Sequence, residues 1–187
     1  MGKLIVSEFI TLDGVMEAPG GEKSHPHTGW AGDLMNEEQL EYKFNEVLEA
    51  ESHLLGRVTY ESFAGAWPQR EGPFADKVNA MPKYVVTSSP EALGWNNCSP
   101  ITGDIVAGIQ QVKDRSEGSI LVAGSRTLVP LLLDNNLVDE VTLMVFPIVL
   151  GSGNRFFPSS PNKRLLKLAS AKTFSNGVQV NTYQLVQ

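Results

Sequence analysis

Short apolar runs alternate with amphipathic segments along most of the chain. Runs with the length and composition of buried strands occupy residues 3–12, 52–56, 83–89 and 119–123. A longer apolar run follows at 137–151. The last segment, 165–186, divides into two strands around Asn176-Gly177, a strong hairpin signal. The pattern therefore predicts a sheet whose last two strands are antiparallel neighbours.

Amphipathic segments between these runs predict helices. They occupy residues 36–50, 57–67, 102–115 and 126–135. The first helix begins at Asn36, a favourable N-cap residue. Its predicted apolar face consists of Leu40, Phe44, Val47 and Leu48. Strands that alternate with helices before a final hairpin predict an α/β fold in a single domain over residues 1–187. We expect a three-layer α/β/α arrangement with a mostly parallel central sheet and an antiparallel C-terminal hairpin.

The segment between the first strand and the first helix is rich in glycine. Residues 15–34 read VMEAPGGEKSHPHTGWAGDL and follow neither a strand nor a helix period. A loop of this length inside a compact domain is typical of a lid or a binding loop, with disorder as the alternative.

Composition and charge argue against several classes of function. The chain has 187 residues and a formal net charge of -6, which disfavours a nucleic-acid or anionic-membrane partner. Its one cysteine, Cys98, cannot form an internal disulfide and belongs to no zinc-binding array. No apolar run is long enough to cross a membrane, and the N-terminus lacks the features of a secretory signal. We therefore expect a cytoplasmic protein.

Small and hydroxyl-bearing residues follow the predicted strands at the point where each strand ends. We call these short segments, which connect a strand to the next turn or helix, steps. They are Asp13-Gly14, Gly56 to Thr59, Thr87-Ser88-Ser89 and Ala123 to Thr127. In open α/β sheets, ligands bind beyond the carboxyl ends of the strands, and N–H groups at helix starts bind phosphate oxygens. Several such steps on one sheet edge suit a dinucleotide. For each step, a tight turn or a helix cap is the alternative.

Two charged residues at these steps are candidates for specific roles. Arg57 follows a strand and a glycine at a helix start, where a guanidinium can hold a phosphomonoester with two hydrogen bonds. A surface arginine is the alternative. Asp13 ends the first strand, where its carboxyl could protonate or anchor a substrate ring. A turn-forming role is the alternative for this residue.

A metal site and a serine-hydrolase site have less support in the sequence. His25 and His27 have no third ligand at a suitable spacing, so no metal site is predicted. The sequence contains no G-x-S-x-G motif of a serine hydrolase. Trp30 and Trp67 belong to or adjoin predicted loops, where such rings either pack against the core or line a substrate site.

The chain resembles the dihydrofolate-reductase-like superfamily over nearly its whole length. The segments that carry the resemblance read ITLDGVME, LLGRVTYESFAGAWP, KYVVTSS and ILVAGSRTLVPLLLDNNLVDEVTLMVFPIVLGSG. Within the superfamily, the chain is most similar to the branch built on the reductase domain of riboflavin biosynthesis, the C-terminal half of a bifunctional deaminase–reductase. The resemblance implies that fold, an NADPH cofactor and a homodimer.

The resemblance also assigns residues to sites. It implies a cofactor site formed by Gly56, Arg57, Thr59, Thr87, Ser88, Ser89, Ala123, Gly124, Ser125, Arg126 and Thr127. In this site Arg57 would hold the adenosine 2′-phosphate, and Ala123 stands where relatives commonly have glycine. Asp13 is implied as the catalytic residue at the nicotinamide end. Trp30, Trp67 and Arg70 are implied on the substrate side.

We therefore expect an NADPH-dependent reductase. It would transfer a hydride to a small heterocyclic, imine or carbonyl substrate, either pterin-like or riboflavin-precursor-like. The alternative is a catalytically silent NADP-binding protein that acts as a sensor or a structural dimer. A third reading is a flavin-binding module that uses Thr87-Ser88-Ser89 as a phosphate cradle.

Overall fold

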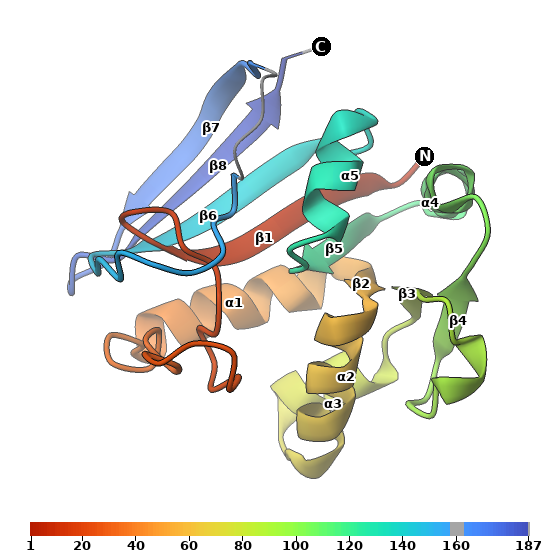
Figure 1. The fold of residues 1–187 in the computed structure, drawn as a ribbon, viewed down its shortest axis with the longest axis horizontal. Coiled ribbons are helices and arrows are strands. Elements are labelled where there is room, and N and C mark those ends of the chain that lie inside the picture. The colour runs from red at the N-terminus through yellow and green to blue at the C-terminus, as the bar shows by residue number, and fades with distance from the viewer. Residues whose placement is uncertain (158–162, 187) are drawn as a thin grey trace.

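Eight strands form one mixed sheet, which Figure 1 shows in a computed structural model. The structure describes residues 1–157 and 163–186. The strands are β1 (Lys3–Thr11), β2 (Ala50–Gly56), β3 (Lys83–Val86), β4 (Cys98–Ile101), β5 (Ser119–Ala123), β6 (Glu140–Phe146), β7 (Leu166–Thr173) and β8 (Gln179–Leu185). Their order across the sheet is β4-β3-β2-β5-β1-β6-β8-β7.

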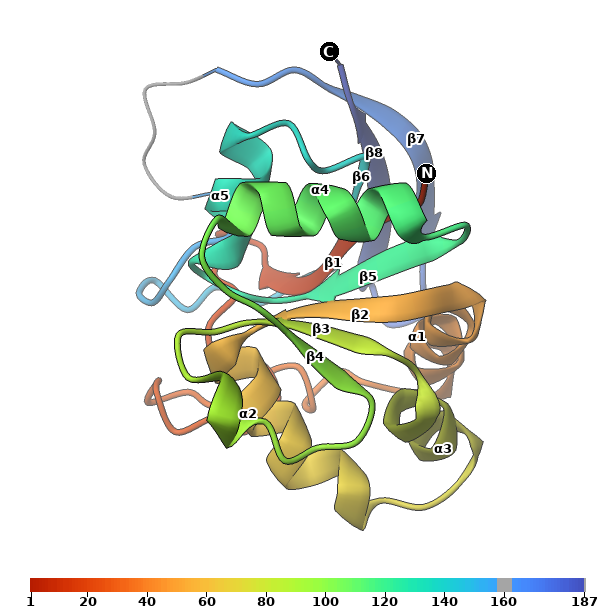
Figure 2. The same ribbon diagram turned by 90° about the vertical axis from the view of Figure 1, so that its right-hand side faces the viewer.

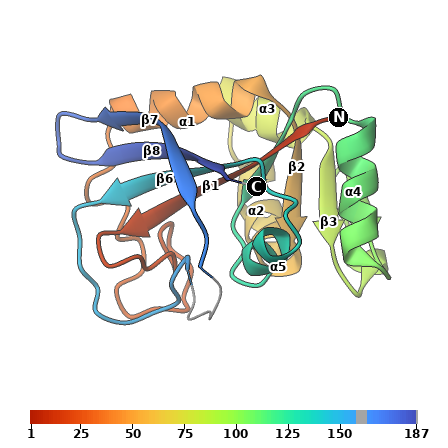
Figure 3. The same ribbon diagram turned by 90° about the horizontal axis from the view of Figure 1, so that it is seen from above.

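The sheet is parallel except at its C-terminal edge. All neighbours from β4 to β6 pair in parallel, whereas β8 pairs antiparallel with both β6 and β7. Figure 3 shows β7 and β8 at the end of the sheet opposite β3 and α4. The prediction of a mostly parallel sheet with an antiparallel C-terminal hairpin is therefore confirmed.

Helices cover both faces of the sheet. The helices are α1 (Glu37–Glu49), α2 (Arg57–Ala66), α3 (Pro73–Ala80), α4 (Ile105–Arg115) and α5 (Leu128–Asp134), with short 3₁₀ turns η1 (Trp67–Gln69) and η2 (Pro90–Ala92). Figure 2 shows α4 and α5 on one face and α1, α2 and α3 on the other. This confirms the predicted three-layer arrangement. Within the described residues, no helix is long and apolar enough to cross a membrane.

Three apolar clusters stabilise these layers. The largest joins β1, β5 and β6 to α4 and α5, with Leu4, Val122 and Leu132 completely buried. A second cluster joins β2 and β3 to α1, α2 and α3, and a third lies between β6, β8 and the loop that precedes α1. Burial of apolar surface is the dominant favourable term in folding, so these clusters fix the carboxyl ends of the strands in place.

The structure differs from the sequence prediction in three elements. Strand β4 and helix α3 were not predicted, because β4 has only four residues, one of them Pro100, and α3 is short and begins at a proline. The apolar run at 137–151 forms a strand only as far as Phe146. Pro147 follows, and a proline cannot donate a ladder hydrogen bond.

The buried side of α1 was predicted correctly only in part. Val47 is buried and Phe44 is half-buried, as predicted, but Leu40 and Leu48 are exposed and Gln39 is buried. The Gln39 side chain accepts a hydrogen bond from the Asn36 backbone N–H in a capping box and donates one to Asn176 Oδ1 at 2.9 Å. These polar contacts dock the start of α1 on the β7–β8 turn. Hydrogen bonding, and not the spacing of apolar residues, therefore determines which side of α1 is buried there.

A buried ion pair ties α4 to the start of β6. The Nζ of Lys113 lies 2.7 Å from Asp139 Oδ2, with the lysine side chain 4% exposed and the aspartate side chain 33% exposed. Lys113 also donates to the carbonyl of Leu137, and Asp139 accepts the N–H of Leu4. The pair thus bridges the amino ends of β1 and β6.

We predict that the two partners of this ion pair tolerate removal unequally. Asp139→Ala leaves a buried ammonium unpaired and should lower the free energy of unfolding by roughly 3 kcal/mol. Lys113→Met leaves a partly exposed carboxylate, which water can solvate, so this substitution should lower the free energy of unfolding by a smaller amount. Urea unfolding of both variants measures the difference, and equal losses would contradict this asymmetry.

Candidate functional site

The switch point of the sheet, the place where open α/β sheets form a ligand crevice, lies between the carboxyl ends of β1 and β5. The two strands are neighbours, but β1 continues to α1 on one face of the sheet and β5 continues to α5 on the other (Figure 2). Their pairing ends at Ser7 and Ala123, while β1 runs on to Thr11 beside β6 alone. Such a switch in connection is where open α/β sheets bind ligands.

Two glycines allow the segments around this crevice to approach closely. A Cβ added at Gly56 would lie 2.7 Å from Ser125 Oγ, so the ends of β2 and β5 touch there. Gly124 has φ +70°, and a Cβ at this position would lie 2.9 Å from Thr59 Oγ1. Both contacts exclude a side chain. The small residues therefore let the ends of β5 and β2 pack against the start of α2.

The start of α2 presents backbone N–H groups that no side chain caps. Its N-cap residue is Gly56, and no side-chain hydrogen bond is present there. The first N–H groups of a helix have no partner within the helix and carry partial positive charge. This ten-residue helix therefore offers donors for an anion beside the predicted hydroxyls.

A pocket of about 330 Å³ lies between the carboxyl ends of β2 and β3. It is lined by Arg57, Tyr60, Glu61, Thr87, Ser88, Ser89, Ala92 and Leu93. The Nη1 of Arg57 lies 2.5 Å from Glu61 Oε1, and both side chains are more than half exposed. A solvated pair of this kind is weak, so the guanidinium can exchange it for an anion in the pocket.

The structure brings together most of the predicted cofactor residues. Gly56, Arg57 and Thr59 start α2, the Thr87–Ser89 segment lines the adjacent pocket, and Gly124-Ser125 abuts both Gly56 and Thr59. Ala123 ends β5 at the crevice, half-buried. Arg126 and Thr127 are exposed at the start of α5. Together these residues line the carboxyl ends of β3, β2 and β5.

Asp13 holds two loops together at the carboxyl end of β1. Its carboxylate accepts hydrogen bonds from Thr11 Oγ1 at 2.6 Å, Gly151 N at 2.9 Å and Leu150 N at 3.3 Å. The bond from Thr11 is the largest cause that lowers the pKa of Asp13, and the two N–H groups add to it. An ionised, fully engaged carboxylate is a poor proton donor at neutral pH. This geometry favours the turn-forming role, and the catalytic role of Asp13 stays a prediction.

A second acid, which the sequence did not single out, lies on β1 beside Gly124. Glu8 is 8% exposed, and its Oε1 is buried without a hydrogen-bond partner among the described residues. This oxygen lies 3.4 Å from the position of a Cβ at Gly124. Burial raises the pKa of Glu8 to about 8, against the opposing effects of the Lys43 charge and the Gly124 N–H. Glu8 is therefore mostly uncharged at neutral pH.

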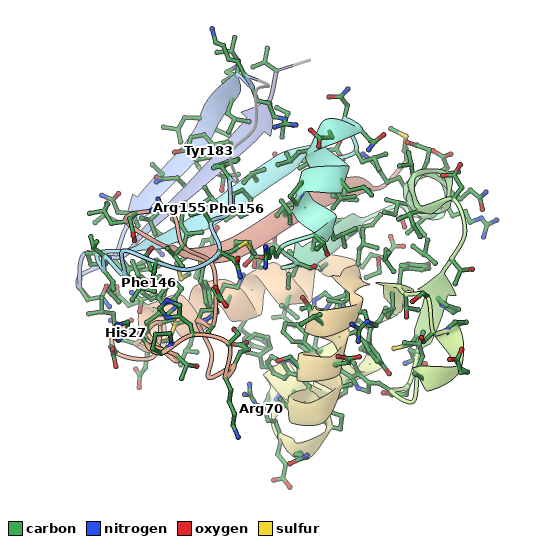
Figure 4. All side chains as sticks on the ribbon, in the orientation of Figure 1. His27, Arg70, Phe146, Arg155, Phe156 and Tyr183 are labelled. Atoms are coloured by element: carbon green, nitrogen blue, oxygen red, sulfur yellow. The ribbon has the colours of Figure 1, made fainter. Side chains whose placement is uncertain are left out.

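Of the three predicted substrate residues, Trp67 and Arg70 are in contact, whereas Trp30 packs in a different apolar cluster. Trp30 is 3% exposed, and its indole N–H donates to the Glu17 carbonyl at 2.7 Å, so it packs the loop against the sheet. Trp67 lies in η1 beyond α2, where the Arg70 guanidinium stacks 4.6 Å from its ring centre. Arg70 is exposed and labelled in Figure 4. Trp67 and Arg70 therefore form a unit, and the role of all three toward a substrate stays a prediction.

The two loop histidines bond locally. His25 is buried, its Nδ1 accepts the backbone N–H of His27 at 3.1 Å, and its Nε2 lies 3.4 Å from Ser152 Oγ. Figure 4 shows His27 at the same end of the molecule as Phe146, where β6 ends. Over residues 1–157 and 163–186, no three His, Cys, Asp or Glu side chains are grouped so as to hold a metal ion.

Comparison with known sequences identifies relatives along the whole chain. The family model described as the RibD C-terminal domain matches residues 2–180. The uncharacterized protein YyaP of Bacillus subtilis is 26% identical over 185 residues, which cover 94% of this chain and 91% of that protein.

Solved structures share the fold at low sequence identity. One is a putative riboflavin biosynthesis protein from Shewanella sp. PV-4, with a TM-score of 0.78 and 18% identity over 99% of both chains. Another is the dihydrofolate reductase of Enterococcus faecalis complexed with NADP(H), with a TM-score of 0.64 and 16% identity over 99% of this chain and 97% of that one. The predicted resemblance to the dihydrofolate-reductase-like fold is thus confirmed.

We predict that Asp13 contributes to stability in a pH-dependent manner. Because its pKa is lower in the folded state, its contribution is present above the ordinary aspartate pKa of about 3.9 and is lost as the pH falls through the folded pKa. Asp13→Asn should therefore be less stable than the wild type at neutral pH, with the difference shrinking in acid. Urea unfolding at several pH values measures this, and a constant difference would contradict it.

Proposed function

The chain belongs to the RibD C-terminal domain family, and on that premise we propose that it is an NADPH-dependent reductase of a small heterocyclic, imine or carbonyl substrate. The observation that carries this proposal is the polar edge formed by the start of α2, the Thr87–Ser89 pocket and the Gly124-Ser125 step. The same edge combines free helix N–H groups, hydroxyls and one arginine, which is the donor set that a phosphorylated dinucleotide requires.

The arrangement of donors supports one direction for the bound cofactor. Arg57 is the one cationic side chain in the pocket of about 330 Å³, so the adenosine 2′-phosphate would bind there. The pyrophosphate would follow at the uncapped start of α2, where Gly56 and Ser125 touch. The nicotinamide would then reach the crevice between β1 and β5, beside Gly124.

The protein's own groups would orient the reaction. When bound, NADPH supplies the hydride, and the crevice has to hold the ring and exclude water. Gly124 permits a close approach because it has no side chain, and Thr59 Oγ1 lies against it. A pterin-like or riboflavin-precursor-like substrate would approach from the side of Trp67 and Arg70, where an aromatic ring and a guanidinium are already stacked.

One observation favours the alternative of a binding protein without turnover. Asp13, the acid that the resemblance implies as catalytic, is occupied by structural hydrogen bonds. The two functions differ in whether bound NADPH is consumed. Absorbance at the NADPH band, followed with a panel of pterins, flavins, quinones and aminouracil phosphates, separates them. Substrate-dependent oxidation would support the reductase, and binding without oxidation by any member would support the sensor.

We also propose a cytoplasmic homodimer. The lone thiol of Cys98 fits a reducing compartment, where disulfides are rare. At the sheet edge, β7 is exposed along almost its whole length, and Leu165 and Leu168 are 63% and 53% exposed. An exposed strand edge with apolar side chains is a ready site for pairing with a second chain.

We predict that Arg57 determines the preference for NADPH over NADH. Arg57→Ala removes a charge-assisted contact to the 2′-phosphate, so NADPH affinity should fall by about tenfold or more, while NADH affinity stays nearly constant. Glu61→Gln should strengthen NADPH binding, because it frees the guanidinium. Fluorescence titration gives both dissociation constants. Arg115→Ala, at an exposed position at the end of α4, is the matched control and should leave the ratio unchanged, whereas an unchanged ratio in Arg57→Ala would contradict the assignment.

The homodimer has its own test. Light scattering during size-exclusion chromatography should give twice the chain mass of 20.4 kDa for the wild type. Leu168→Asp places a charge on the exposed β7 edge and should give a monomer with unchanged thermal unfolding, because the side chain packs little within the chain. A monomeric wild type would overturn the proposal.

A further inference from the structure

Among the described residues, Glu8 is the one acid whose side chain is buried, and it lies at the switch point between β1 and β5. On β1 it occupies the same face as Leu4, Val6 and Ile10, all of which lie in the apolar cluster under α4 and α5. Its Oε1 lies beside Gly124, and Thr59 Oγ1 of α2 lies beside the same glycine. Within the described part of the chain this oxygen has no hydrogen-bond partner. A buried polar atom without a partner is costly, so a bound ligand or a water molecule that donates a hydrogen bond to this oxygen would stabilise the folded chain.

The surrounding charges leave Glu8 without a counter-ion of its own. From α1, the Lys43 ammonium donates to Ser7 Oγ at 2.8 Å and forms an ion pair with Glu46. Glu46 and Glu22, the latter from the loop before α1, both raise the pKa of Glu8, whereas Lys43 lowers it. From α2 and β5, Thr59 and Gly124 lie beside Glu8, and the Gly124 N–H lowers its pKa. Burial outweighs Lys43, and the pKa of about 8 lies close to physiological pH.

The charge of the neighbouring ring differs between the two states of the cofactor. This step rests on the proposed function, in which the nicotinamide end lies beside Gly124. A dihydronicotinamide ring is neutral, and a nicotinamide ring after hydride loss is cationic. In a crevice that excludes water, a carboxyl beside a neutral ring is favoured as the protonated acid. Beside a cationic ring it is favoured as the carboxylate.

We propose that Glu8 stores the proton that accompanies hydride transfer. The reaction breaks the C4–H bond of the dihydronicotinamide, and the hydride with its electron pair forms a C–H bond at the substrate carbon. The π bond of the substrate C=N or C=O group opens onto the heteroatom. That heteroatom takes the proton from the Glu8 O–H group, directly or through a water molecule. Glu8 is left as a carboxylate beside the oxidised ring, and solvent returns its proton after the oxidised cofactor leaves.

The proposal requires opposite pH dependences for the two cofactor states, and this can be measured without a substrate. NADPH should bind less tightly as the pH rises above the pKa of Glu8, because binding favours the protonated acid. NADP⁺ should bind less tightly as the pH falls below that pKa, because binding favours the carboxylate. The ratio Kd(NADP⁺)/Kd(NADPH) should therefore fall with increasing pH, by at most about tenfold per pH unit. Arg57 and the 2′-phosphate affect the Kd values of both nucleotides equally, so their effects cancel in this ratio.

The experiment is a titration of the full chain with NADPH and with NADP⁺ between about pH 6 and pH 9.5, across the Glu8 titration. Glu8→Gln keeps the shape of the uncharged acid and cannot titrate, so its ratio should not vary with pH. Glu37→Gln makes the same substitution at an exposed position at the start of α1 and should retain the wild-type slope. A second measurement needs no variant: near pH 8, wild-type protein in weak buffer should release protons on binding NADP⁺ and take them up on binding NADPH.

The outcomes separate this inference from the proposed function. If the wild type binds both nucleotides but its ratio is independent of pH, or if Glu8→Gln retains the wild-type slope, Glu8 does not store the proton and the cofactor site stands. If the correctly folded wild type binds neither nucleotide, both the cofactor site and the role of Glu8 are overturned. If Glu8→Gln is unfolded, the protons released or taken up by the wild type decide the question. The same number of protons, exchanged in the same direction with both nucleotides, would contradict the proposal.

Discussion

The close approach of β2, β5 and the start of α2 is the constraint on which the rest of the site depends. Gly56 touches Ser125, and Gly124 touches Thr59, at separations that leave no room for a Cβ atom. These contacts are possible because neither Gly56 nor Gly124 carries a side chain. They lie next to the point where β1 and β5 send their connections to opposite faces of the sheet, so the small residues of Ala123-Gly124-Ser125 serve the packing of the fold at its switch point.

The site contains two acids whose environments move their pKa values in opposite directions. Asp13 accepts hydrogen bonds from Thr11 and from two backbone N–H groups, which stabilise its carboxylate. Glu8 is buried with an unpaired oxygen, which stabilises its protonated form. Such a separation is the usual way in which a protein assigns structural and proton-carrying roles to chemically similar groups. In this protein it favours Glu8 over Asp13 for the handling of a proton.

The sequence predicted the sheet well because its central strands are apolar runs bounded by turn residues, as in the segment 119–123. It also predicted the steps around Gly56 and Gly124, since glycine and hydroxyl residues directly after strands can be recognised from the sequence alone. It missed β4, in which four residues with a proline carry too little pattern. The buried face of α1 depends on Gln39 and Asn176, which are far apart in sequence. Glu8 was missed for a related reason: the alternation along β1 places it on the face of Leu4, Val6 and Ile10, but its position beside Gly124 and Thr59 depends on segments far apart in sequence.

The central claim is that a dinucleotide lies across the carboxyl ends of the strands from β3 to β1. A crystal structure of the protein with bound NADPH tests it most directly. The account predicts the 2′-phosphate within hydrogen-bond distance of the Arg57 guanidinium and the pyrophosphate at the start of α2. The nicotinamide should lie against Gly124, with the Glu8 carboxyl at its edge. A cofactor bound elsewhere, or bound in the reverse direction with the nicotinamide at Arg57, would contradict the account.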